Sequence, residues 1–161
     1  MARSSMPPAA RVLDDTDHAI LRELTQDGRL TNSELAARVG IAPSTCHARV
    51  RALVSTGVIT GFHAEIDPAA TGRQLEALIA IRLHAHARGG LRAFQRYLSE
   101  LPATRRVYFV SGERDFLVHV AVADSAGLRR LVGDTLSVRE EVAATNTSII
   151  FEHVPGIRTA L

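Results

Sequence analysis

One glycine, Gly40, separates two short stretches that each have the residue pattern of a helix. The upstream stretch begins at Thr31 and has Glu34 three residues later, a spacing at which the two side chains cap each other's backbone N–H groups. The downstream stretch begins at Pro43, which suits the first turn of a helix because its missing N–H costs nothing there. Two short helices joined by so tight a turn predict a helix-turn-helix.

The second of these helices has a core face and an opposite face of different chemistry. Cys46, Val50 and Leu53 recur at helical spacing, so we expect them to face the core. The opposite face holds no large apolar and no acidic residue, and consists of Ser44, Thr45, His47, Ala48, Arg51 and Ser55. Such a face is typical of a helix that lies in a DNA major groove. Arg49, at the edge of the core face, is expected to reach a phosphate or to pack within the domain.

The charges around this helix also favour a polyanionic partner. Between Glu34 and Glu65 there is no acidic residue, although the whole chain carries a net charge of only +2. The same stretch contains arginines and histidines, and the chain has no lysine. A locally basic segment in a near-neutral protein suits binding to the phosphate backbone. A solvated helix face would have the same composition, and charge alone does not separate the two.

The domain organisation follows from a change of pattern near residue 67. A further helix, capped by Asp14 or Asp15 and ended by Gly28, precedes the two described above. Residues 58–67 have an extended pattern, consistent with a wing or connecting strand. We expect four segments: a flexible lead-in at 1–11, a winged helix-turn-helix domain at 12–66, a hinge at 67–73 and a second domain at 74–161.

Beyond the hinge, strand and helix patterns alternate. Apolar residues at every second position predict strands at 75–83, 107–110, 116–122 and 142–153. Helical spacing predicts helices at 91–101 and 125–136. The order βαββαβ is that of the ferredoxin-like fold, so the whole chain is predicted to be α+β. Helices cover one face of such a sheet, and an apolar open face usually has a partner.

Ordered motifs in both halves resemble the Lrp/AsnC (feast/famine) family of transcription regulators. In the first half these are Ile20-Leu21-x-x-Leu24, Asp27-Gly28-Arg29, Leu35-Ala36-x-x-Val39-Gly40 and Gly57-Val58-Ile59-x-Gly61. In the second half they are Val110-Ser111-Gly112-x-x-Asp115-Phe116-Leu117 and Thr145-x-Thr147-x-Ile149-Ile150. Each motif alone is weak, and the ordered set is specific.

The resemblance implies a winged helix-turn-helix joined to a βαββαβ RAM domain that dimerises through its sheet. Such domains commonly assemble into tetramers or octamers, and many bind an amino acid between subunits. The resemblance places DNA contacts at Ser44, Thr45, His47 and Arg51, with Arg49 secondary. It places effector contacts at Ser111, Gly112, Asp115, Thr145 and Thr147. Two positions depart from the family pattern: Ala42 replaces the usual serine cap, and Ala48 replaces a common arginine.

The chemistry of the effector residues suits a zwitterion. Asp115 follows a glycine turn and could accept hydrogen bonds from an ammonium group. Backbone N–H groups around Gly112 could face a carboxylate, because no Cβ blocks the approach. Thr145 and Thr147 share one face of their strand and offer hydroxyls. The alternative is an ordinary turn residue and ordinary β-branched strand residues.

Other functions are less favoured. Cys46 could be a nucleophile beside His47, but neighbours on a helix point apart, and Cys46 falls on the core face. No phosphate loop, dinucleotide motif or Gly-x-Ser-x-Gly is present, so we expect neither an enzyme nor a cofactor. An oligomeric metabolite-binding module with little sequence-specific DNA binding is the remaining alternative.

A metal site and a membrane location are also disfavoured. His84 and His86 lie two apart at a strand end and could be joined by His119 or His153, but the set lacks any standard ligand spacing. No apolar run approaches the length of a membrane span. A single cysteine excludes an internal disulfide and fits a reducing cytoplasm.

Overall fold

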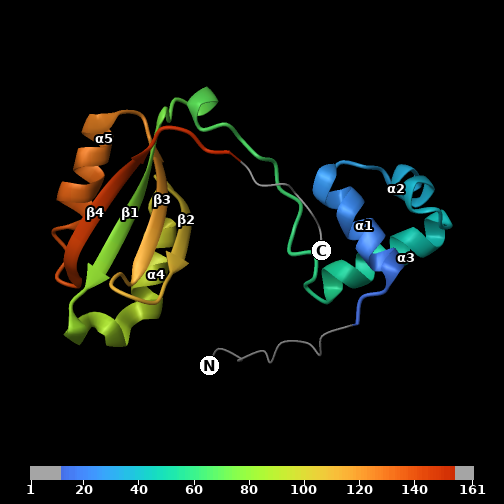
Figure 1. Ribbon diagram of the computed structural model, residues 1–161, viewed down its shortest axis with the longest axis horizontal. Coiled ribbons are helices and arrows are strands. Elements are labelled where there is room, and N and C mark those ends of the chain that lie inside the picture. The colour runs from blue at the N-terminus through green and yellow to red at the C-terminus, as the bar shows by residue number, and fades with distance from the viewer. Residues whose placement is uncertain (1–11, 155–161) are drawn as a thin grey trace. The chain divides into compact units, whose positions relative to one another are not determined.

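The computed structural model describes residues 12–154 of the chain, and these residues form two compact units. Among the described residues, one unit comprises residues 12–65 with Val154 and the other is Ile66–His153, so the division falls just before the expected hinge (Figure 1). Each unit has its own hydrophobic core. The lead-in expected at 1–11 lies outside the described residues.

The first unit contains the three expected helices: α1 (Asp15–Gln26), α2 (Asn32–Val39) and α3 (Pro43–Ser55). Reciprocal side-chain caps begin α1, between Asp14 and Asp17, and α2, between Thr31 and Glu34. Gly40 ends α2 with φ = 76°, in the left-handed region that glycine adopts without steric cost. The helix-turn-helix prediction is confirmed.

A small core joins these helices. Its buried residues come from all three of them, and are Ile20, Leu35, Ala36, Cys46 and Leu53. Residues 58–67, expected to be extended, form neither helix nor strand in the structure. No second strand exists among the described residues of this unit to pair with them, and a lone strand leaves its backbone groups unsatisfied. The strand expected there is therefore absent from the described fold.

The start of α3 lacks a side-chain cap, as the sequence predicts. Ala42 occupies the cap position in an extended conformation, with φ = −64° and ψ = 142°, and offers no hydrogen-bond acceptor. Serine is suited to the same backbone conformation, so Ala42→Ser should stabilise the first unit by about 1 kcal/mol. Thermal unfolding followed by circular dichroism would show this as a higher midpoint. Ala42→Val is the matched control, because valine also offers no acceptor, and an equal midpoint for the serine and valine variants would contradict the capping argument.

The second unit has the predicted βαββαβ order with additional short turns. Its elements are η1 (Ala69–Thr71), β1 (Leu75–Leu83), η2 (Ala85–Gly90), α4 (Leu91–Glu100), β2 (Thr104–Phe109), β3 (Phe116–Val122), α5 (Ser125–Arg130), η3 (Leu131–Leu136) and β4 (Val142–Ile150). The strands form one antiparallel sheet in the order β2-β3-β1-β4. The ferredoxin-like prediction is confirmed.

Several boundaries differ from the expected ones. Strand β2 begins at Thr104 rather than at residue 107, because arginines interrupt the apolar alternation at its start. Strand β4 ends at Ile150 rather than at 153, because its pairing with β1 ends at Glu76, one residue from the start of β1. The helix expected at 125–136 is α5 followed by η3, a π-helical turn.

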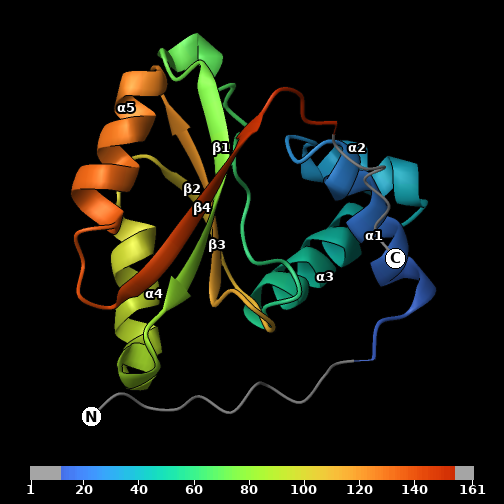
Figure 2. The ribbon, with the colours of Figure 1, turned by 60° about the vertical axis from the view of Figure 1, so that its left-hand side comes forward.

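Both helices, α4 and α5, cover the same face of the sheet (Figure 2). Side chains on that face are fully buried, among them Ile79, Ile81, Phe116 and Val118. Strand register places the alternate side chains on the open face, where Leu78 pairs with His119 and Ala80 with Leu117. At the same face the His119 Nε2 atom lies 2.6 Å from the Glu76 carboxylate. The open face is thus mixed in polarity, with apolar side chains around a half-buried polar pair.

Candidate DNA-binding and effector sites

Helix α3 presents the polar face that the sequence predicts. Its apolar side turns into the core through Cys46 and Leu53, which are fully buried. The predicted DNA-contacting residues Ser44, Thr45, His47 and Arg51 are all exposed. No acidic residue lies on the helix, and Arg51 has no ion pair with a residue that the structure describes. The face therefore offers hydrogen-bond donors and one free positive charge to a groove.

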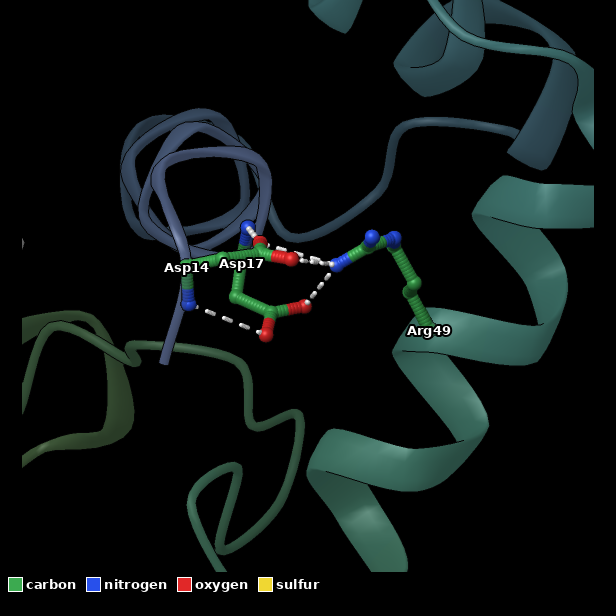
Figure 3. A network of polar contacts seen from close by, with 3 residues as sticks. All are labelled: Asp14, Asp17 and Arg49. Atoms are coloured by element: carbon green, nitrogen blue, oxygen red, sulfur yellow. Dashed lines mark hydrogen bonds and ion pairs between the residues drawn. The ribbon is translucent and has the colours of Figure 1, made fainter. Parts of the chain in front are cut away.

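Arg49 differs from its neighbours because it is tied to α1 (Figure 3). Its Nη1 atom lies 2.8 and 2.7 Å from the two carboxylate oxygens of Asp14 and 3.0 Å from Asp17 Oδ1. Hydrogen bonds to Asp14, the larger cause, and to Asp17 raise the pKa of Arg49 above its usual value. Asp17 is fully buried, whereas a quarter of the Arg49 side chain is exposed.

This network fastens the start of α1 to the middle of α3. The same Asp14 caps α1, so a single carboxylate serves both the helix start and the ion pair. Of the two roles expected for Arg49, the structure favours packing within the domain. Its secondary DNA contact stays a prediction, and the Asp14 and Asp17 partnership is a functional feature that residue spacing did not suggest.

The exposed residues of α3 predict two kinds of DNA-binding defect. Arg51→Ala should weaken binding to all sequences and reduce the slope of log affinity against log salt by about 1, as for one lost phosphate contact. His47→Ala should instead relax sequence preference, because that side chain faces the groove. Gel-shift titrations at two salt concentrations would separate the two variants. Unchanged affinity of Arg51→Ala at every salt concentration would contradict this docking of α3.

The predicted effector residues lie at one end of the sheet, on both sides of β1. Ser111 and Gly112 are exposed in the turn between β2 and β3, and Gly112 has φ = 114°, where a side chain would be strained. The Asp115 N–H donates to Ile81 O of β1 at 2.9 Å. Across β1, Thr145 pairs with the same Ile81. Thr147 lies farther along β4 and is exposed.

Asp115 has internal partners that the sequence did not reveal. One carboxylate oxygen accepts a hydrogen bond from the Leu83 N–H at 2.7 Å. The other lies 3.4 Å from Arg88 Nε, and Arg88 itself is half exposed. Only 12% of the Asp115 side chain is accessible. Asp115 thus joins β3 to the end of β1 and forms an ion pair with the half-exposed Arg88 side chain. Its contact with an effector stays a prediction.

Arg88 is the residue near this site that sequence reasoning missed. It lies in η2, within a Gly-rich stretch that carries no periodic signal. Thr145 has one internal contact, 3.4 Å between its hydroxyl and that of Ser137. In this chain the five predicted effector residues therefore form two groups, the turn with Asp115 and the two β4 threonines, separated by β1.

Comparison with known proteins identifies both units. Residues 13–60 match the winged helix-turn-helix DNA-binding family, and residues 76–156 match the Lrp/AsnC ligand binding domain. The chain belongs to the Lrp/AsnC family. It is a DNA-binding transcription regulator with a ligand-binding domain.

Relatives of this regulator match along almost its whole length. The HTH-type transcriptional regulator AldR of Mycolicibacterium smegmatis is 50% identical over 147 residues, which cover 91% of this chain and 86% of that protein. AldR of Mycobacterium tuberculosis is 46% identical over 155 residues, 96% of this chain and 87% of that one. A transcriptional regulator of Neisseria meningitidis, solved in complex with L-Met, matches with a TM-score of 0.84 and 29% identity over 93% of this chain and 96% of that one.

The relatives are named as regulators, and this Lrp/AsnC protein is a regulator rather than an enzyme. Burial of Cys46 also raises the pKa of its thiol, which disfavours a nucleophilic thiolate. His84 and His86 stack with ring centroids 5.4 Å apart at the end of strand β1, where His84 directly follows Leu83 and His86 lies in η2. Within residues 12–154, no group of three or more His, Cys, Asp or Glu side chains could hold a metal, and no helix could span a bilayer.

Proposed function

We propose that this Lrp/AsnC regulator reads operator DNA with α3 and that a bound amino acid changes its DNA affinity or its assembly. The observation that carries the DNA-reading part is the exposed, acid-free face of α3. Ser44, Thr45 and His47 would contact base edges, and Arg51 would contact a phosphate. Arg49 would contribute mainly by holding α3 against α1.

The amino-acid part rests on the ligand-binding domain and on the Neisseria meningitidis relative solved with L-Met. Asp115 and Arg88 together offer an acceptor for an ammonium group and a donor for a carboxylate. The exposed turn at Ser111 and Gly112 adds backbone N–H groups. We place the effector there, with Thr145 and Thr147 as further contacts.

We further propose that the site is completed by a second subunit. The turn group and the β4 group lie on opposite sides of β1, about two strand spacings or roughly 10 Å apart, which exceeds the reach of one amino-acid backbone. A second subunit could bring residues of its own to the turn.

The oligomer would form through the open face of the sheet. Leu78, Ala80 and Leu117 lie there beside the half-buried Glu76 and His119 pair, an arrangement suited to burial in a homodimer. Assembly into tetramers or octamers is expected from the family. A two-fold dimer would read a roughly palindromic operator, with half-sites about one or more helical turns apart. The cytoplasmic location stays a prediction.

A thermal-shift screen of the full chain against the common amino acids tests the effector, because a ligand that binds only the folded state raises the melting temperature. DNA affinity and sedimentation are then measured with and without the best amino acid. The proposal expects salt-dependent DNA binding that the amino acid changes. Absence of DNA binding, with an effector still bound, would favour the metabolite-binding module, and a monomer at micromolar concentration would contradict the dimer.

A further inference from the structure

A further feature of the second unit (Ile66–His153, called the sensor unit below), away from the turn at Ser111 and Gly112, is a basic cavity beside the edge of the sheet. It has a volume of about 400 Å³ and lies between α4 and the edge strand β2. Its described lining includes no acidic residue, and consists of Arg92, Gln95, Arg96, Ser99, Thr104, Arg105, Arg106 and Val107.

The helical spacing on α4 and a β-bulge in β2 bring the four arginines together. Arg92 and Arg96 are four residues apart on α4, so they share one face of that helix. Arg105 and Arg106 are neighbours on β2 and would point to opposite faces of a regular strand. The pairing of β2 with β3 shifts register between Thr104 and Arg106, which leaves Arg105 as an extra residue in a β-bulge. Bulges redirect side chains, and here both neighbours line the same cavity.

The charges in this cavity are not neutralised by any residue that the structure describes. Elsewhere in the described chain, Arg38, Arg49, Arg88 and Arg139 each have a carboxylate partner. The four cavity arginines form no ion pair with any residue from 12 to 154. Arg105 donates to the carbonyl oxygen of Ile66 at 3.3 Å, which anchors it without cancelling its charge. Like charges held so close repel one another, and a bound anion would remove that repulsion.

The uncharged lining offers further contacts to an anion. The Thr104 hydroxyl oxygen is buried and has no hydrogen-bond partner in the structure, although buried polar groups are nearly always paired. Ser99 and Gln95 add a hydroxyl and an amide to the same wall. A bound oxyanion would supply acceptors for all three donors.

We propose that this cavity binds a small metabolite that carries two or more phosphoryl groups. Guanidinium groups match phosphate oxygens in pairs, and four of them call for more than one dianionic group. A free amino acid is excluded here, because its ammonium would find no carboxylate in the lining. The volume is within the range of small-molecule sites, so we assign the site to a metabolite rather than to the DNA backbone.

The test uses the full chain, with tripolyphosphate as the probe and calorimetry at low salt as the measurement. Wild type should bind the probe, and Arg92→Ala/Arg96→Ala should bind it about ten- to a hundredfold more weakly, as expected for lost charge-assisted hydrogen bonds. Both replaced residues are exposed, so the variant should fold. The matched control is Arg129→Ala/Arg130→Ala on α5, which removes the same charge from exposed positions and should change affinity less than twofold.

Duplex DNA provides the second arm of the experiment. The Arg92→Ala/Arg96→Ala variant should keep the wild-type affinity for duplex DNA and the wild-type salt slope. The proposal is overturned if wild type does not bind millimolar tripolyphosphate, or if both double variants lose affinity equally. It is also overturned if the cavity variant loses duplex binding with a salt slope lower by about 2, since the surface would then contact DNA.

Discussion

Replacing Asp115 with Asn should lower the affinity for the amino-acid effector by about ten- to a hundredfold while the sensor unit stays folded. The loss follows from removing a charge-assisted hydrogen bond to the ammonium group. The fold should tolerate the change because the Asn side-chain oxygen can still accept the hydrogen bond from the Leu83 N–H. The pair with the half-exposed Arg88 is lost, at a cost of less than about 1 kcal/mol. Calorimetry with the best amino acid from the screen measures the affinity.

Two further variants separate binding from folding. Asp115→Ala leaves the Leu83 N–H buried and unpaired, so it should destabilise the sensor unit by about 1–3 kcal/mol. Arg88→Ala should weaken the effector's carboxylate contact with little change in stability, because Arg88 is half exposed. If Asp115→Asn binds the effector as tightly as wild type does, Asp115 only joins β3 to β1, and the ammonium site lies elsewhere.

Replacing Arg49 with Met should lower the unfolding temperature of the helix-turn-helix unit by roughly 5–10 °C. Methionine keeps most of the aliphatic packing but removes the guanidinium that Asp14 and Asp17 share. Asp17 is fully buried, so its carboxylate would lose a cationic partner in a site that water does not reach. Circular dichroism at a helix-sensitive wavelength follows the transition.

The chain supplies a matched control for this prediction. Arg38 pairs with Glu23 at 3.2 Å, but half of its side chain is exposed, so Arg38→Met should shift the midpoint by less than about 2 °C. Adding Asp17→Asn to Arg49→Met should restore part of the loss, because it removes the buried negative charge. If Arg49→Met unfolds at the wild-type temperature but binds DNA weakly, the stabilising role is contradicted and Arg49 contacts DNA instead.

The helices of the first unit were predictable because their signals are local. The caps at Asp14 and Thr31 lie within three residues of their partners, and Gly40 marks its turn directly. The exposed face of α3 follows from helical spacing once Cys46 and Leu53 are placed in the core. The same reasoning predicted the order of strands and helices along the second unit, since periodicity needs only neighbouring residues.

What could not be predicted depends on contacts between distant residues. Asp17 and Arg49 are 32 positions apart, as are Leu83 and Asp115, and no periodicity connects them. Asp115 has a glycine turn before it, which suggests an exposed residue, whereas its pairing with β1 buries it. The bulge at Arg105 depends on the register of β2 against β3, so the arginine cavity could not be predicted before the strand pairing was known.

The pairing of β1 with β4 also decides the order in which the protein can fold during synthesis. The core of the helical unit is complete once residue 60 has been made, and its three helices follow one another directly along the chain, which favours fast folding. The sheet closes only when Val142–Ile150 has been made, because that last strand pairs with the first, Leu75–Leu83. A chain that stops before Val142 would therefore carry a finished DNA-reading unit and an unpaired β1 edge. Such an edge is a template for pairing with another chain, so premature termination should yield aggregates.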